Sequence, residues 1–464
     1  MASQHIGPPL SRRAFLGAVG GSAAWFATGG LGALAGTTLA AKPGGGTRNP
    51  LYLPPTVSPA GLGLTAAAGT VPLGGGKTST AWVYNGSLPG PTIVARTGDR
   101  ATIALTNGLA QPTITHWHGM LVDHANDGHP MEAIGPGGTY AYDFPILNRA
   151  ALNWYHPHPH MLTGEQVAMG LAGAFIVRDA VEDALGLPGG AYEIPLVLRD
   201  TRFDPTGNMQ YKPRSGGFEG PIPLINGTLN PKLDVLQTIY RFRALGGSNA
   251  RIFRLALGNG RPLYLIGNDG GLLASTVQES QIDLAPGERL DLLVDFRGLA
   301  NGTKVTLRDL RAGWDLLEFN VGDPGPSFTI PTTLSTITPL AGPSAVTRRF
   351  SFDGMTKING RVYDMERIDF SVPFGTIERW RFTTSGNAPH PVHVHGASFQ
   401  VVSRSGGRGR TYSWEQGWKD TVLLEDRETV DVFVRFDAYR GVYLMHCHKL
   451  EHEDMGMMSN FEVV

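Results

Sequence analysis

Cys447 is the only cysteine of the chain, and it lies between two histidines in the run Leu444-Met445-His446-Cys447-His448. His452 follows five residues after the cysteine, and Met457 follows ten residues after it. A thiolate, imidazoles and a thioether together form the ligand set of a blue-copper centre. The run therefore predicts a redox-active metal site.

The 14 histidines are clustered along the chain. His5 lies near the N-terminus, and no histidine occurs between His160 and His390. Most of the others form four groups: His116/His118, His156/His158/His160, His390/His393/His395 and His446/His448/His452. A site built from these groups requires the two ends of the chain to meet in the folded protein.

The His-x-His spacing suits extended strands. Residues i and i+2 of a strand share a face and the residue between them points the other way, so His446 and His448 would face away from Cys447. One strand could then contact two metal sites. Four pairs with this spacing supply eight imidazoles, the number that a trinuclear copper cluster requires: His116/His118, His156/His158, His393/His395 and His446/His448.

Composition limits the elements that can position these side chains. A chain of 464 residues is expected to form two or three domains. Its 62 glycines, 33 prolines and many short alternating runs favour β-structure. A net charge of −1 gives no indication of a nucleic-acid partner, and a single cysteine allows no internal disulfide.

An Asn-Gly pair recurs at Asn85-Gly86, Asn226-Gly227 and Asn359-Gly360, with offsets of 141 and 133 residues. Alternating apolar runs follow each pair. We infer three β-sandwich domains, near residues 50–180, 190–325 and 335–464. Because the second repeat has no histidine, we expect metal within the third domain and between the first and third, with the second as a structural spacer.

The N-terminus resembles an export signal. The twin-arginine pair Arg12-Arg13 precedes a Gly/Ala-rich stretch that ends at Ala41. We predict a removable twin-arginine signal over 1–41 and a linker over 42–49, which implies a periplasmic or secreted protein. A membrane anchor is the alternative, but the glycines between Gly20 and Gly36 weaken a spanning helix, so no stable anchor is expected after removal of the signal.

Four motifs in this order resemble those of the three-domain multicopper oxidases, in particular the laccase-like and cuprous-oxidase group. The resemblance covers essentially the whole mature chain and implies three consecutive cupredoxin-like Greek-key β-sandwiches, an all-β fold. The motifs are His116-Trp117-His118-Gly119, Trp154-Tyr155-His156-Pro157-His158, His390-Pro391-Val392-His393-Val394-His395-Gly396 and the run from His446 to Met458.

The resemblance implies four copper ions and a role for each matching position. Cys447, His390 and His452 would bind the type 1 copper, with Met457 as a weak axial ligand. His116 and His393 would bind the type 2 copper. The type 3 pair would be bound by His118, His156, His158, His395, His446 and His448.

Two assignments have rivals in the sequence. His160 has the same spacing from His158 as His156 has, and the family motif favours His156. Met455 and Met458 flank the proposed axial ligand, whereas the offset from Cys447 favours Met457.

Two carboxylates match family residues that handle protons and water. Asp127 matches the acid near the type 2 copper, and Glu453 matches the carboxylate that delivers protons to reduced oxygen. Reduction of dioxygen to water consumes protons, so a buried acid near the cluster is chemically required.

The implied reaction couples four one-electron oxidations of a donor to reduction of dioxygen to two waters. Electrons would enter through an exposed edge of His452 or His390, and Cys447 would pass them on through His446 and His448. A Met axial ligand indicates a moderate oxidant. The protein is expected to be a monomer whose partners are dioxygen and a small-molecule or metal-ion donor.

The donor is the least defined feature. Cuprous oxidases of the family often carry a Met-rich insertion before the third Asn-Gly pair, whereas residues 323–358 contain only Met355. This favours phenols and related donors over cuprous ion. More distant alternatives are a copper-free structural or division-associated relative, a two-domain copper nitrite reductase and a copper-storage protein.

Overall fold

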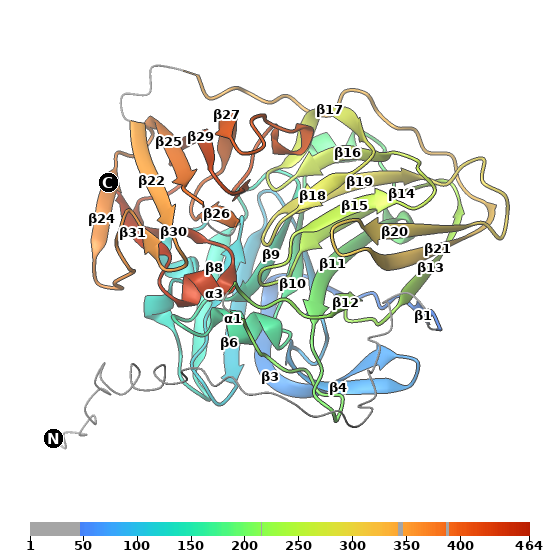
Figure 1. The fold of residues 1–464 in the computed structure, drawn as a ribbon, viewed down its shortest axis with the longest axis horizontal. Coiled ribbons are helices and arrows are strands. Elements are labelled where there is room, and N and C mark those ends of the chain that lie inside the picture. Colours follow the sequence, from blue (N-terminus) through green and yellow to red (C-terminus); the bar gives the residue numbers. More distant parts are fainter. Residues whose placement is uncertain (1–46, 215, 342–346, 387–388) are drawn as a thin grey trace, which may run out of the picture. The chain divides into compact units, whose positions relative to one another are not determined.

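The computed structural model describes residues 47–464 except 215, 342–346 and 387–388. The predicted export signal and residues 42–46 of the predicted linker lie outside the described residues. Six sheets dominate the described chain, and the alternating runs and Asn-Gly turns of the sequence form its strands and hairpins. The all-β, cupredoxin-like fold class is confirmed (Figure 1).

The first two sheets hold residues 56–178. One has the order β2 (Thr56–Val57), β5 (Thr92–Arg96), β10 (Gly173–Arg178), β9 (Ala151–Pro157) and β7 (Thr115–His118). The other has the order β4 (Lys77–Tyr84), β3 (Ala60–Gly74), β6 (Arg100–Gly108) and β8 (Thr139–Pro145). A core that includes Leu64, Trp117 and Phe175 fills the space between them.

The next two sheets hold residues 193–324 together with an N-terminal strand. One has the order β1 (Asn49–Pro50), β13 (Pro231–Gln237), β21 (Trp314–Pro324), β20 (Lys304–Asp309), β15 (Phe253–Leu257) and β18 (Ile282–Leu284). The other has the order β12 (Ile222–Ile225), β11 (Glu193–Thr201), β14 (Ile239–Gly246), β19 (Arg289–Asp295), β16 (Leu263–Asn268) and β17 (Gly271–Glu279). Asn49 pairs with Pro231, so the first strand of the described residues belongs to the second pair of sheets, and the strands of the first pair follow it in the sequence.

The last two sheets hold residues 347–463. One has the order β23 (Lys357–Ile358), β22 (Thr347–Asp353), β25 (Ile377–Thr384), β29 (Glu428–Arg435) and β27 (Phe399–Gly406). The other has the order β24 (Ile368–Val372), β31 (Met458–Val463), β30 (Gly441–Cys447), β26 (His390–Val394) and β28 (Thr421–Leu424). Cys447 and Met457 belong to the core between these sheets.

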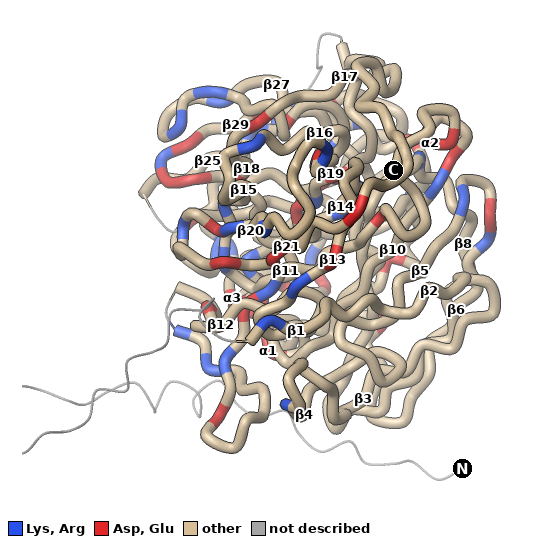
Figure 2. The backbone as a smooth tube through the Cα atoms, turned by 90° about the vertical axis from the view of Figure 1, so that its right-hand side faces the viewer, with Lys and Arg blue, Asp and Glu red and all other residues tan. Residues whose placement is uncertain are grey.

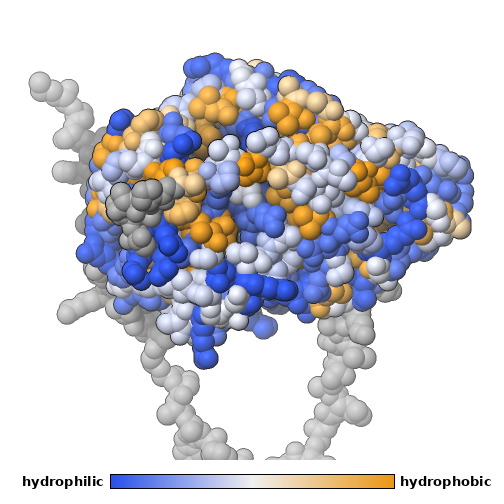
Figure 3. Space-filling model, turned by 90° about the horizontal axis from the view of Figure 1, so that it is seen from above, coloured by the Kyte–Doolittle hydropathy of each residue, from blue (hydrophilic) through white to orange (hydrophobic). Residues whose placement is uncertain are grey.

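Helices are few and short in the described chain: α1 (Thr163–Ala168), α2 (Ala180–Asp183) and α3 (Leu450–Asp454). Within the described residues, no helix has the length and apolar character needed to cross a membrane. Lysines and arginines are interspersed with acidic residues over the molecule (Figure 2). In the view from above, hydrophobic surface residues form small patches separated by hydrophilic ones (Figure 3).

The three Asn-Gly pairs adopt one conformation. Asn85, Asn226 and Asn359 have φ of 49°, 48° and 52°, and the glycines after them have φ of 73°, 71° and 72°. Positive φ at both residues is the type I′ turn that asparagine and glycine favour. Each asparagine also bonds to a neighbouring strand through both side-chain atoms: Oδ1 accepts from Thr65, Val197 and Ser351, and Nδ2 donates to the carbonyls of Gly63, Pro195 and Arg349.

Candidate metal centre

Four strands place the paired histidines. In the first pair of sheets β7 lies antiparallel to β9, with His116 opposite His156. In the third, β26 lies antiparallel to β30, with His393 opposite His446. The residues between the histidines point into the cores, as Trp117 and Cys447 show. All eight paired histidines are at most 1% exposed.

The imidazoles from the two ends of the chain meet. The Nε2 atoms of His116 and His393 are 3.4 Å apart. His446 Nε2 lies 3.3 Å from His158 Nε2 and 3.1 Å from His395 Nε2. The structure therefore joins the predicted cluster residues across the first and third pairs of sheets.

Apart from His116 and His393, the cluster histidines form two sets of three neighbouring rings. The side-chain nitrogens of His158, His395 and His446 lie within 4.8 Å of one another. The other three rings are also neighbours: the centroid of His448 is 4.9 Å from that of His118 and 5.2 Å from that of His156, and the last two are 5.7 Å apart.

Hydrogen bonds to Nδ1 orient several rings. His116 Nδ1 lies 2.7 Å from the carbonyl oxygen of Asp127, and His393 Nδ1 lies 2.9 Å from that of Asp420. His395 Nδ1 lies 2.7 Å from Asp127 Oδ2. An Nδ1–H donated to these oxygens leaves the Nε2 lone pair for a metal.

His118 has the opposite arrangement. Its Nε2 lies 3.1 Å from Asp420 Oδ1, whereas its Nδ1 is buried and has no hydrogen-bond partner. Its ring stacks on that of His393, with centroids 3.6 Å apart. His118 is therefore set to bind a metal through Nδ1.

A second centre surrounds the thiol of Cys447. The Sγ atom lies 3.4 Å from His390 Nδ1 and 3.6 Å from His452 Nδ1, and these two nitrogens are 3.2 Å apart. His390 comes from the start of β26, and His452 comes from α3, which follows β30 directly. The structure brings together the three residues predicted to bind one copper.

The surroundings also distinguish the rival ligands. Met457 is fully buried in the core that contains Cys447, and its carbonyl accepts from the Cys447 amide at 3.1 Å. Met455 is 40% exposed, and Met458 packs in a separate cluster. His160 packs against Tyr363, with centroids 5.3 Å apart. The geometry thus favours Met457, and it favours His156 over His160.

Both predicted carboxylates lie against the histidines. Asp127 is fully buried; burial raises the pKa of its carboxyl, but the charges and hydrogen bonds of His395 and His116 outweigh this and hold the pKa well below its usual value. Glu453 Oε2 lies 3.1 Å from His446 Nδ1, and its Oε1 lies 3.7 Å from His158 Nδ1. Burial raises the pKa of Glu453.

The donor set fits a soft, thiophilic metal ion such as copper. Burial lowers the pKa of His393 and of His390 to about 4, so these imidazoles are neutral and can donate their lone pairs. Burial raises the pKa of the Cys447 thiol to about 12, so a bound cation is needed to stabilise its thiolate. In the histidine cluster, several buried nitrogens have no hydrogen-bond partner: His118 Nδ1, His156 Nε2 and both nitrogens of His448.

The expectation of an exposed imidazole edge at the cysteine centre is wrong. His390 and His452 are both 0% exposed. The chain after β11 packs over α3: Tyr211 Oη donates to Glu451 Oε1 at 3.2 Å, and a Cβ added at Gly217 would lie 3.0 Å from Glu451 Oε2. An electron donor at the surface therefore cannot touch either imidazole directly.

Asp420 is a site residue that the sequence motifs do not reveal. It lies just before β28, its carbonyl orients His393, and its carboxylate contacts His118. The carboxylate in turn accepts two hydrogen bonds from Arg289 of β19. Neither residue belongs to a histidine motif, so only the fold shows their role.

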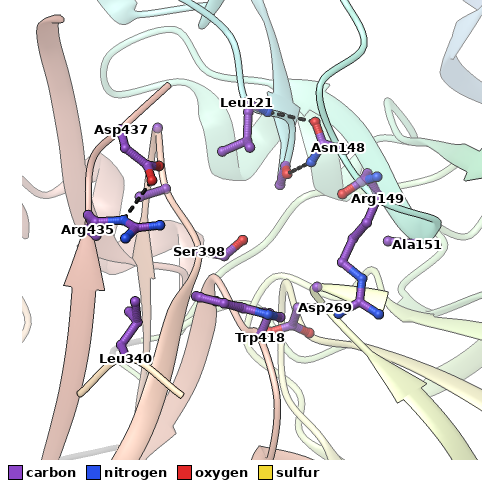
Figure 4. Close-up of a pocket in the computed structure, with 15 residues that line it drawn as sticks. Leu121, Asn148, Arg149, Ala151, Asp269, Leu340, Ser398, Trp418, Arg435 and Asp437 are labelled. Carbon is purple, nitrogen blue, oxygen red and sulfur yellow. Dashed lines mark hydrogen bonds and ion pairs between the residues drawn. The ribbon is translucent and has the colours of Figure 1, made fainter. Parts of the chain in front are cut away.

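A pocket of about 280 Å³ opens beside this group (Figure 4). Residues of all three pairs of sheets, and of the segment between the second and third, line it. Gly119 and Gly396 directly follow the cluster histidines His118 and His395. The rest of the wall includes Asn148, Arg149, Asp269, Leu340, Trp418, Arg435 and Asp437.

Asn148 shapes one wall of the pocket. Its Nδ2 donates to the Gly119 carbonyl at 2.8 Å, and its Oδ1 accepts from the Leu121 amide at 2.9 Å. Figure 4 shows Trp418 and Asp269 on the side facing this asparagine. The pocket therefore reaches from the surface to the residues that adjoin the histidine cluster.

Comparison with known proteins places this site in a family. Two family models described as multicopper oxidase match residues 65–182 and 337–464. The chain is 33% identical to multicopper oxidase mco of Staphylococcus haemolyticus over 82% of its own length and 83% of the relative's. It also matches the solved structure of McoA multicopper oxidase from Aquifex aeolicus, with 36% identity and a TM-score of 0.83 over 90% of this chain and 99% of that one. The match to laccase from Pediococcus acidilactici Pa5930 has 33% identity and a TM-score of 0.86 over 91% of this chain and 95% of that one.

Cell division protein FtsP of Dickeya dadantii is similar to the same degree, with 32% identity over 91% of this chain and 93% of the relative. Overall similarity therefore does not separate a division protein from an oxidase. The complete and converging ligand set described above does, because a structural protein does not require it. The chain belongs to the multicopper oxidase family and is a copper-dependent, laccase-like oxidoreductase that takes electrons from a donor and passes them to dioxygen.

Proposed function

We propose that the protein binds four copper ions and oxidises phenols or similar donors, one electron at a time, while four electrons reduce one dioxygen to two waters. The observation that carries the proposal is the meeting of eight buried imidazoles next to a strand whose cysteine belongs to a second centre. His116 and His393 would bind the type 2 copper. The type 3 ions would be bound by His158, His395 and His446 and by His118, His156 and His448.

The type 1 copper would be bound by Cys447, His390, His452 and axially by Met457. When bound, copper supplies reversible one-electron chemistry and the activation of dioxygen. β30 itself connects the centres, because Cys447 is covalently joined to His446 and His448. Only a few covalent bonds then separate the thiol from the two imidazoles.

Glu453 is proposed to hold and deliver protons. It lies between His446 and His158, away from solvent, and burial raises its pKa, so it holds a proton more readily than an ordinary carboxyl does. Asp127, with its lowered pKa, would stay ionised and keep His395 and His116 oriented. The pocket beside Gly119 and Gly396 would admit solvent and dioxygen.

The twin-arginine run supports export to the periplasm or the exterior, and we propose that the exported protein is a monomer without a membrane anchor. That export route carries folded proteins, which suits a chain whose ligands meet only after folding.

The donor can be tested by oxygen uptake of the copper-loaded protein, comparing a phenol with cuprous ion held by a weak chelator. Fast uptake with the phenol and little with cuprous ion is expected. The reverse preference would assign the protein to copper tolerance, and no uptake with either donor would contradict an oxidase.

Cuprous oxidation is the second candidate because a thioether is exposed at the end of α3. Met455 is 40% exposed and lies three residues after His452. Thioethers are soft ligands for cuprous ion. Met455→Leu should leave phenol oxidation unchanged and reduce uptake with cuprous ion if this candidate is correct.

A further inference from the structure

Arg289 has an unusual position for a residue of the histidine-free part of the chain. It begins β19, in the second pair of sheets, and it is 0% exposed. Its guanidinium reaches the boundary where the first and third pairs of sheets meet. A buried guanidinium is costly unless its donors are satisfied.

All five N–H donors of the guanidinium have acceptors. Nε donates to the Leu152 carbonyl of β9 at 3.0 Å. One terminal nitrogen donates to the Gly287 carbonyl at 2.9 Å and to Asp420 Oδ1 at 2.6 Å. The other donates to the Asp269 carbonyl at 3.1 Å and to Asp420 Oδ2. One side chain thus ties together residues from all three pairs of sheets.

Asp420 passes this constraint to two cluster histidines. Its Oδ1 lies 3.1 Å from His118 Nε2, and its carbonyl lies 2.9 Å from His393 Nδ1. Thr421 adds a hydrogen bond from its hydroxyl to the same carboxylate oxygen at 2.9 Å. The bidentate pair with Arg289 therefore fixes the carboxylate that holds His118 with Nδ1 free.

The turn before β19 also contacts the cluster. Gly287 has φ of +80°, and a Cβ added there would lie 3.0 Å from the His448 ring and 3.1 Å from His118 Cε1. Gly119 is equally confined, since an added Cβ would lie 2.6 Å from the guanidinium and 2.8 Å from Asp420 Oδ2. Backbone and guanidinium together form one wall of the cluster.

We propose that Arg289 is a positioning residue for the histidine cluster, and that the second pair of sheets therefore builds the copper site rather than only separating its neighbours. The inference rests on the proposed function, because it concerns how the predicted copper ligands are held. Arg289 acts through Asp420 and touches no reacting atom. Its loss should loosen the cluster selectively and spare the centre of Cys447.

Arg289→Lys is the direct test, because lysine keeps the charge but cannot form the bidentate pair. Arg241→Lys is the matched control: Arg241 is also buried, pairs with Asp291 and Glu182, and contacts none of the cluster histidines in the described structure. Copper per protein, the type 2 electron paramagnetic resonance signal and the blue absorption are measured for both variants and the parent.

Arg289→Lys should keep the blue absorption but lose cluster copper to a chelator, with an affinity about 10–100-fold weaker and an altered type 2 signal, whereas Arg241→Lys should match the parent. If Arg289→Lys does not fold, Asp420→Asn keeps the side-chain shape and should give the same selective loss. A parental copper content and type 2 signal in Arg289→Lys, or an equal loss in both arginine variants, would overturn the inference. A parent protein without cluster copper would instead refute the proposed function.

Discussion

A thiol with a pKa of about 12, buried between two neutral imidazoles, does not become a thiolate near neutral pH without a cation. Cys447 is thus a thiol of low reactivity, although its thiolate is a strong metal ligand. The same burial lowers the pKa of the surrounding imidazoles and keeps them as ligands. At the scale of single residues, exclusion of water prepares the site for metal before any metal binds.

Cys447→Ser should abolish the blue absorption and oxidase turnover, because the alkoxide of serine is a hard and poorly available replacement for a thiolate. Absorption spectroscopy and oxygen uptake measure both losses. Oxidase turnover that survives the substitution would contradict the assignment of Cys447.

Glu453→Gln should keep the blue absorption and slow turnover by about 10²–10⁴-fold, the usual range for loss of a general acid. Because the acid form is the active one and its pKa is raised, parental activity should fall as pH rises through that pKa, and the variant should lack this decline. Rates over a pH series check both points.

Glu451→Gln is the control for this variant. Glu451 lies on the same helix, is 5% exposed, and bonds to Asn249 at 2.8 Å rather than to a histidine. It should turn over at nearly the parental rate. Equal rates in Glu453→Gln and the parent would remove the proton role of Glu453.

The sequence predicted the histidines and the cysteine because ligand types at short spacings form motifs within single strands and turns, and it predicted the two acids through their match to family residues. Asp420 and Arg289 escaped this reading, since an isolated aspartate and arginine acquire their role only when three pairs of sheets dock. The prediction of an exposed edge on His390 or His452 was wrong for a related reason. The exposure of an imidazole depends on segments from elsewhere in the chain that pack over it.

At the scale of elements, the Asn-Gly turns combine a backbone and a side-chain function. Their type I′ geometry closes a hairpin, and the asparagine side chain bridges to a neighbouring strand. The sequence indicated the turns and the strands after them. It could not indicate the bridging bonds, because Thr65, Val197 and Ser351 lie at different separations from their asparagines.

Asn226→Ala should lower the free energy of unfolding by about 2–4 kcal/mol. It leaves buried backbone groups without hydrogen-bond partners, and it forces alanine into a left-handed conformation. Asn226 is 1% exposed, whereas Asn85 is exposed. Asn85→Ala should cost less, since water replaces its bonds. Denaturant unfolding of the two variants measures the difference, and equal losses would contradict the role of burial.

At the scale of the whole molecule, a buried ion network joins the second pair of sheets to α2, the short helix that follows the first pair. Arg241 and Arg243 of β14 bond to Glu182 of α2 at 2.8 and 2.7 Å, and Arg241 also pairs with Asp291. Burial raises the pKa of Glu182, but the charges of Arg243 and Arg241 outweigh it and lower the pKa to about 2. This carboxylate stabilises the folded protein only while it is ionised.

The stability that Glu182 contributes should be complete above its unfolded pKa of about 4.5 and disappear as pH falls towards 2. Glu182→Gln should lower the free energy of unfolding by about 3–5 kcal/mol at pH 7, because it leaves buried arginines short of a partner. The free energy of unfolding of the variant should also fall less than that of the parent as the pH is lowered. Unfolding measured across pH 2–7 tests this, and an equal fall in both proteins would contradict it.

Because both ends of the chain supply ligands, the site is assembled in a fixed order during synthesis. His116 leaves the ribosome long before His452, by about 20–70 s at 5–20 residues per second. During that interval the first sheets can form, but the histidines of β7 and β9 have no partners from β26 and β30. Both centres are therefore completed only after β30 has been made, and a chain that ends before β30 carries six of the eight cluster histidines and lacks Cys447 and His452.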